Sequence, residues 1–223
     1  MCQGKYARSM AMVSVGLLAA AAMVVAAQQR STSPLTVVVY DFEDAEDRAA
    51  PAAVHPQVEA GRFMQPGFFA PPARYFDGSL GGEAGEAIID RESPRYYDFT
   101  VGGLEALDRL ERLSFTVTTR QSHAAAGHLV SVSTFKGEDE TERPLVFDVY
   151  RAGERMDDPE QAAVETYFIG GHVGNARRIV VDLSGLDHAD RHTFRIRFDR
   201  PRMRSRTALD DVELTALPQG GAR

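Results

Sequence analysis

The sequence predicts an all-β domain, a two-sheet antiparallel sandwich of the jelly-roll kind with about nine strands and one or two short helical turns. Hydrophobic and polar residues alternate with a period of two, as where Phe194, Ile196 and Phe198 alternate with Arg195 and Arg197, which is typical of strands with one buried face. These runs are rich in β-branched and aromatic residues. Gly, Pro, Asp or Asn separates most of them, as expected for turns between strands.

Residues 1–27 have the layout of a secretory signal peptide. A basic start with Lys5 and Arg8 precedes an uncharged run from Ala11 to Ala27 that ends in small residues, the pattern that a signal peptidase recognises. We expect cleavage before Gln28, a secreted or periplasmic location, and no stable membrane insertion afterwards. The run is also near the length of a membrane span, so an uncleaved anchor is the alternative.

Composition excludes several classes of partner and chemistry. The chain carries 32 acidic and 25 basic residues, a net charge of −7, and this acidity argues against nucleic acid as a partner. The one cysteine, Cys2, lies inside the expected signal. We therefore expect a mature chain without disulfides or thiol chemistry, stabilised by burial of its core alone.

The expected organisation is a linker at 28–34, a sandwich at 35–217 and a flexible tail at 218–223. Nine runs have strand character: 35–42, 95–101, 113–119, 129–135, 145–151, 164–169, 178–183, 193–198 and 209–215. Leucines spaced three apart in Gly103–Leu113 predict a short helix or helical turn there, and Asp157–Gln161 is expected to form another turn.

The long connection from Ala45 to Gly85 is the expected binding loop, because connections of that length in compact domains usually bind ligands or lack order. The chain has no Trp, so the candidate residues for stacking on a sugar are Phe68, Phe69, Tyr75 and Phe76. The same aromatics could instead plug the edge of the sandwich. His172, in a glycine-rich turn, is a further candidate for lining a site.

Acidic residues gather at the end of the first strand and the start of the last. First and last strands commonly lie side by side in jelly rolls, which would join Glu43 and Asp44 with Asp210 and Asp211. Alternation places Asp210 inward, where a carboxylate needs a partner. A structural Ca²⁺ ion held by these four residues would supply it. In the alternative, the acids are solvated strand-end residues and Asp210 bonds to the backbone.

These end motifs also carry a family resemblance. Tyr40–Glu43 and Ala208–Val212 resemble the opening and closing motifs of MAM domains, and more closely those of jelly-roll modules in exported bacterial proteins of the PEP-CTERM type. Tyr96–Val101, Leu113–Val117 and Thr193–Arg197 agree. The resemblance covers roughly residues 36–217, but the cysteines of MAM domains and the Pro-Glu-Pro sorting segment are missing. It implies a jelly-roll, galactose-binding-like or MAM-like sandwich with a cation at the motif acids and, in some members, carbohydrate binding.

The residues favour an exported, non-catalytic module that binds carbohydrate or an envelope protein, or that is structural. The chain lacks a Gly-x-Ser-x-Gly nucleophile motif, and Gly81–Glu86 lacks the Lys and Ser/Thr of a phosphate-binding loop. His188 and His192 are spaced for zinc on a helix, but they lie in a polar turn between a glycine and a strand. Two alternatives stay open: a jelly-roll or concanavalin-like polysaccharide lyase or glycoside hydrolase, and a subunit of a surface assembly.

Overall fold

The computed structural model describes residues 33–44, 46–47, 49–63, 96–119, 127–136, 141–170, 175–202 and 207–219. Most of them belong to one compact unit, Pro34–Gln219. The elements are β1 (Leu35–Tyr40), β2 (Ala53–Val54), β3 (Glu59–Ala60), β4 (Tyr96–Gly102), the 3₁₀ turn η1 (Leu104–Ala106), β5 (Leu107–Thr119), β6 (Gly127–Lys136), β7 (Arg143–Leu145), β8 (Phe147–Arg151), β9 (Gln161–Val164), β10 (Thr166–Gly170), β11 (Ala176–Asp182), β12 (His192–Arg202) and β13 (Thr207–Pro218). A search of the described part of the chain for helices able to cross a membrane finds none.

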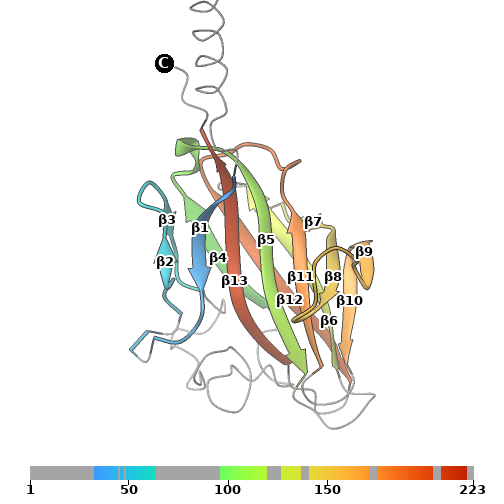
Figure 1. The fold of residues 1–223 in the computed structure, drawn as a ribbon. Coiled ribbons are helices and arrows are strands. Elements are labelled where there is room, and N and C mark those ends of the chain that lie inside the picture. The colour runs from blue at the N-terminus through green and yellow to red at the C-terminus, as the bar shows by residue number, and fades with distance from the viewer. Residues whose placement is uncertain are drawn as a thin grey trace, which may run out of the picture. The chain divides into compact units, whose positions relative to one another are not determined.

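The strands form two antiparallel sheets, one in front of the other in Figure 1. Sheet A has seven strands in the order β2-β1-β13-β5-β11-β8-β9. Sheet B has six in the order β10-β6-β12-β4-β3, with β7 paired to β6 beside that path. The predicted β-sandwich is therefore confirmed. The nine predicted runs correspond to the longer strands, and β2, β3, β7 and β9 add pieces of two to four residues.

The first and last strands lie side by side, as the sequence predicts. In the antiparallel pair of β1 and β13, Tyr40 lies opposite Val212 and Leu35 opposite Ala216. β13 also pairs with β5 along most of its length, so it lies between β1 and β5 in sheet A. It also brings the acidic end of β1 close to the start of β13.

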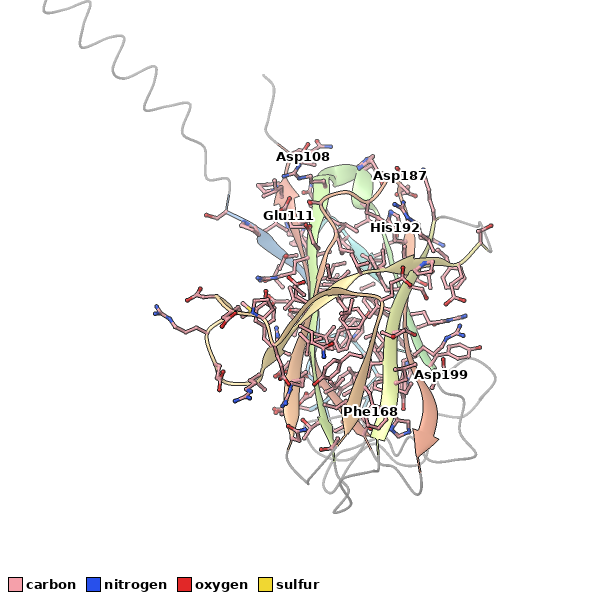
Figure 2. All side chains as sticks on the ribbon, turned by 90° about the vertical axis from the view of Figure 1, so that its right-hand side faces the viewer. Asp108, Glu111, Phe168, Asp187, His192 and Asp199 are labelled. Carbon is pink, nitrogen blue, oxygen red and sulfur yellow. The ribbon has the colours of Figure 1, made fainter. Side chains whose placement is uncertain are left out.

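The core lies between the sheets and is rich in aromatic rings, which Figure 2 shows from the edge of the sandwich. Phe63, from the long connection after β3, is fully buried and packs against Tyr40, Tyr97 and Phe99 with ring centroids 5.3 to 5.6 Å apart. The Phe63 N–H donates to the Ala49 carbonyl at 2.8 Å. The start of this connection therefore contributes to the core.

The helix expected over 103–113 is reduced to the single turn η1, and the chain is a strand from Leu107 onward. Gly103 precedes the turn with φ 73°. Its N–H donates a hydrogen bond to Asp190 Oδ1 at 3.2 Å. The Leu104 N–H donates to the Asp190 carbonyl at 3.0 Å. The loop before β12 thus holds the start of β5.

Two β-bulges explain why the leucine spacing is misleading. Along β13, Thr215 pairs with Arg112 and the next residue pairs with Leu110, and Leu217 pairs with Arg109 while the next residue pairs with Leu107. Each step passes over one residue of β5, so each bulge adds one residue to the usual alternation. Leu107, Leu110 and Leu113 are buried at a spacing of three in a strand.

Candidate functional site

The outward face of sheet B carries a cluster of aromatic and charged side chains. We define the polar–aromatic patch as Tyr96, Asp98, Phe135, Glu142, Arg195 and Arg197. Alternation places the strand residues of this set on the outside, because the residues between them (Tyr97, Phe99, Thr134, Phe194 and Ile196) are buried. Register places Arg195 of β12 directly opposite Asp98 of β4 and Ser133 of β6.

Arg195 and Asp98 form the centre of the patch. Arg195 donates from Nε to Asp98 Oδ1 and from Nη2 to Asp98 Oδ2, both at 2.8 Å, a two-point pairing. The guanidinium carbon lies 4.0 Å from the Tyr96 ring centroid and 4.8 Å from that of Phe135, within reach of a cation–π attraction. Hydrogen bonding to Asp98 raises the pKa of Arg195. With side-chain exposures of 18% and 17%, the pair is largely shielded and held in one geometry.

A second, more exposed pair lies at the edge of the patch. Arg197 donates from Nη2 to both carboxylate oxygens of Glu142, at 3.1 and 3.0 Å. Ser133 Oγ donates to Glu142 Oε1 at 2.5 Å, and Arg195 Nη1 lies 3.7 Å from Glu142 Oε2. The Arg197 and Glu142 side chains are 34% and 36% exposed. They are therefore more open to solvent than Arg195 and Asp98.

Sheet A presents a different outward face. Its centre is Arg178, which donates from Nη2 to Ser114 Oγ at 2.7 Å and lies 3.7 Å from Glu213. Thr116 lies opposite Arg178, Thr36 Oγ1 donates to Glu213 at 3.1 Å, and the outward aromatic Tyr150 is 9% exposed. Sheet B instead has Tyr96, Phe135 and Phe168 partly exposed on its outward side. Among the described residues, accessible rings beside charged groups thus gather on sheet B.

The predicted metal residues lie where β1 ends and β13 begins, but Asp210 does not point inward as alternation suggested. Asp211 and Val212 both lie opposite Phe115, so β13 bulges here, and Asp211 has φ 49°. Leu209 and Val212 are both fully buried, which shows that the extra residue resets the alternation. Asp210 pairs with the outward Thr116 and is itself on the outward side of sheet A.

Acidic neighbours nevertheless act on Asp210. The pKa of Asp210 is raised to about 7: burial is the largest cause, and the charges of Asp211, Glu43 and Asp41 add to it, while the hydrogen bond from the Asp211 N–H to Oδ1 at 2.8 Å opposes the shift. The sequence prediction did not include Asp41. Asp44, which it did include, accepts the Glu46 N–H at 2.8 Å and shapes a turn.

The acidic group formed by Asp41, Glu43, Asp210 and Asp211 is referred to below as the acidic rim. Within the described ranges, no three His, Cys, Asp or Glu side chains are grouped so that they could hold a metal ion. A Ca²⁺ ion at the rim would therefore also need backbone or water oxygens, which that ion accepts. The calcium site stays a prediction.

The histidine-bearing turn before β12 is structural. His192 is buried, its Nε2 lies 3.1 Å from the Asp187 carbonyl, and burial lowers its pKa, while His188 is exposed. Figure 2 labels Asp187 and His192 at this end of the sandwich. A hollow of about 20 Å³ lies here, lined mainly by Leu104, Leu107, Leu110 and Leu186 with a polar margin. It has room for a single water-sized group.

The aromatic candidates Phe68, Phe69, Tyr75 and Phe76, and also His172, lie outside the described residues, so their role stays a prediction. The patch on sheet B was not among the predicted sites. Its signal was present in the alternation, which already placed Arg195 and Arg197 outward. Only the strand order brings them beside Tyr96 and Phe135.

No family model and no curated protein matches the chain, so the resemblance to MAM-like and PEP-CTERM-type modules stays a prediction. Among solved structures, the chain is similar to TmCBM27, a carbohydrate-binding module described for specific mannan recognition, at 10% identity and a TM-score of 0.37. The match covers 82% of this chain and 98% of the module. At that similarity it carries nothing about the ligand, which has to follow from the residues of this chain.

Proposed function

We propose that this domain is an exported, non-catalytic module that binds carbohydrate through the polar–aromatic patch. The observation that carries the proposal is the pair of rings, Tyr96 and Phe135, held beside planar charged groups on the outward face of sheet B. Aromatic rings present apolar faces to the C–H surface of a sugar, while carboxylates accept from hydroxyls and guanidinium groups donate to them. The patch offers both kinds of contact.

Preorganisation supports binding. Arg195 is fixed by Asp98 and contacts both rings, so these side chains have little freedom left to lose when a ligand arrives. Side-chain ordering otherwise costs about 0.5–1.5 kcal/mol for each flexible residue immobilised on binding. A rigid platform of this kind suits weakly hydrophobic ligands such as sugars.

The arrangement favours binding over hydrolysis. Glycoside hydrolysis needs two carboxyl groups flanking one bond, with one of them free to donate a proton. Asp98 and Glu142 are instead tied to Arg195 and Arg197. Asp210, whose pKa is raised to about 7, is on the outward side of the other sheet. The carboxyl groups of the patch therefore serve as hydrogen-bond acceptors.

Two further parts of the proposal concern the N-terminal segment and the acidic rim. The basic and apolar segment over residues 1–27 supports export with cleavage near Gln28. The mutual repulsion of the carboxylates at the acidic rim supports a structural Ca²⁺ ion there, because a cation would relieve it.

A glycan array probed with residues 28–223 tests the carbohydrate proposal, followed by titration calorimetry on each hit. Tyr96→Ala and Arg197→Gln should each weaken binding by about tenfold or more, the effect of losing roughly 1.4 kcal/mol. Arg178→Gln is the matched control, because it removes an arginine paired with Ser114 and Glu213 from the opposite sheet. Equal losses in Arg197→Gln and Arg178→Gln, or a blank array, would refute the proposal.

A further inference from the structure

We infer that the polar–aromatic patch selects uncharged polysaccharide chains and rejects uronate-containing or sulfated ones. The inference rests on the proposed function and names the substrate class of the same site. It follows from how the charges of the patch are already paired, and from what an incoming anion would have to displace.

The arginines of the patch are already neutralised. Arg195 is held by Asp98 with two hydrogen bonds of 2.8 Å, and Arg197 by Glu142 at 3.0 and 3.1 Å. Asp199, next on the outward side of β12 and labelled in Figure 2, adds a further acidic residue beside them. The local charge is therefore slightly negative, and the whole chain carries −7.

An anionic sugar could take the Nε and Nη2 groups of Arg195 only by displacing Asp98, and at Arg197 it would meet the neighbouring carboxylate of Glu142. Displacement of Asp98 would leave a largely shielded carboxylate without its partner, since the side chain is only 17% exposed. The free-energy penalty of leaving a buried charge without its hydrogen bonds exceeds the free energy gained from one new contact with the sugar. A neutral hydroxyl avoids this cost, because it can add to the free lone pairs and N–H groups while the ion pairs stay intact.

The layout also fits an extended chain. Tyr96 is on β4 and Phe135 on β6, with β12 between them. Tyr96 lies opposite Arg197 and Phe135 opposite Thr193, but the two ring centroids are 4.0 and 4.8 Å from the Arg195 guanidinium carbon between them, so a polysaccharide passing over Arg195 can meet both. The exposed Arg197–Glu142 pair is on the same face. Arg195 is a positioning residue in this arrangement, whereas Arg197 and Glu142 contact the ligand.

The test is titration of residues 28–223 with three soluble polymers: a neutral glucan or mannan, a polyuronate and a sulfated galactan. Each is measured at low and at high salt. Binding of the neutral polymer with an affinity unchanged by salt supports the inference, because exposed charge attraction would be screened. Preferential, salt-sensitive binding of either acidic polymer overturns it and leaves carbohydrate binding standing. Failure of all three polymers to bind refutes the proposed function itself.

A charge variant separates selection by the patch from repulsion by the whole chain. Glu142→Gln frees Arg197 and should raise affinity for the polyuronate by about tenfold, within the range that close charge pairs contribute. Glu213→Gln is the matched control, because Glu213 faces Arg178 on sheet A and its loss changes the net charge equally. Should Glu142→Gln fail to fold, Asp199→Asn is the second patch variant, because it also removes one negative charge beside Arg197 on the outward side of β12 and should likewise raise affinity for the polyuronate. Equal gains in the patch variant and Glu213→Gln would overturn the inference.

Discussion

Replacing Asp210 by Asn should make the stability of the domain less dependent on pH. Asn keeps an oxygen that can accept the Asp211 N–H, which donates to Asp210 at 2.8 Å, but removes the negative charge. In the native chain, burial and the acidic neighbours raise the pKa of Asp210 from 3.8 to about 7. The folded state therefore holds its proton more tightly than the unfolded state, so this residue destabilises the fold once it is ionised.

The sign and size of the effect follow from linkage. The stability that the protonated form contributes is fully present below pH 3.8, falls as pH rises, and is lost above about pH 7. At 1.36 kcal/mol per pKa unit, the ceiling is about 4 kcal/mol. The side chain is partly exposed, so solvent screening reduces the expected effect to about 1–2 kcal/mol. That amounts to a rise of about 2–8 °C in Tm for Asp210→Asn at pH 8.

Urea unfolding followed by circular dichroism from pH 4 to pH 9, with EDTA present, measures this directly. The chain has no Trp, which makes backbone dichroism the suitable probe. Asp182→Asn is the control, because Asp182 also accepts a neighbouring backbone N–H, that of Ser184 at 2.9 Å, but is exposed at the end of β11. Parallel pH profiles for the native chain and Asp210→Asn would refute the reasoning.

Three other predictions address the cation, the export signal and the core. Ca²⁺ should raise Tm in a concentration-dependent way because it binds the folded state alone, and Asp210→Ala should abolish the rise; identical melting in Ca²⁺ and EDTA would leave the acids as strand-end residues. Mass spectrometry of the exported protein should find its N-terminus near Gln28, whereas an intact residue 1–27 segment in the membrane fraction would indicate an anchor. Phe63→Ala should cost about 3–5 kcal/mol in urea unfolding because it empties a fully buried site, and a loss below about 1 kcal/mol would contradict the assigned packing.

Period-two alternation was sufficient to predict most of the fold. Phe194, Ile196 and Phe198 are buried in β12 while Arg195 and Arg197 face outward, as the pattern indicates. The pairing of β1 with β13 was also predicted. The strands of two to four residues were not, because segments that short have too few residues to show a period.

Bulges account for the local errors. The leucines of β5 repeat every three residues because two extra residues are accommodated opposite β13, and such a spacing on its own resembles a helix. The bulge at Asp211 likewise turned Asp210 outward against the prediction. In a bulge, two residues of one strand lie opposite a single residue of the partner strand. Whether this happens depends on the register between segments that are about a hundred residues apart in the chain.

The same dependence on register explains why the patch could not be found from the sequence. Alternation places Tyr96, Asp98 and Arg195 on outward positions one strand at a time. It does not show that Arg195 meets Asp98, which is 97 positions away along the chain. That contact exists because β12 lies between β4 and β6 in sheet B. The buried residues of each strand specify the sandwich. The outward residues form a site only because the strand order of that sandwich brings them side by side.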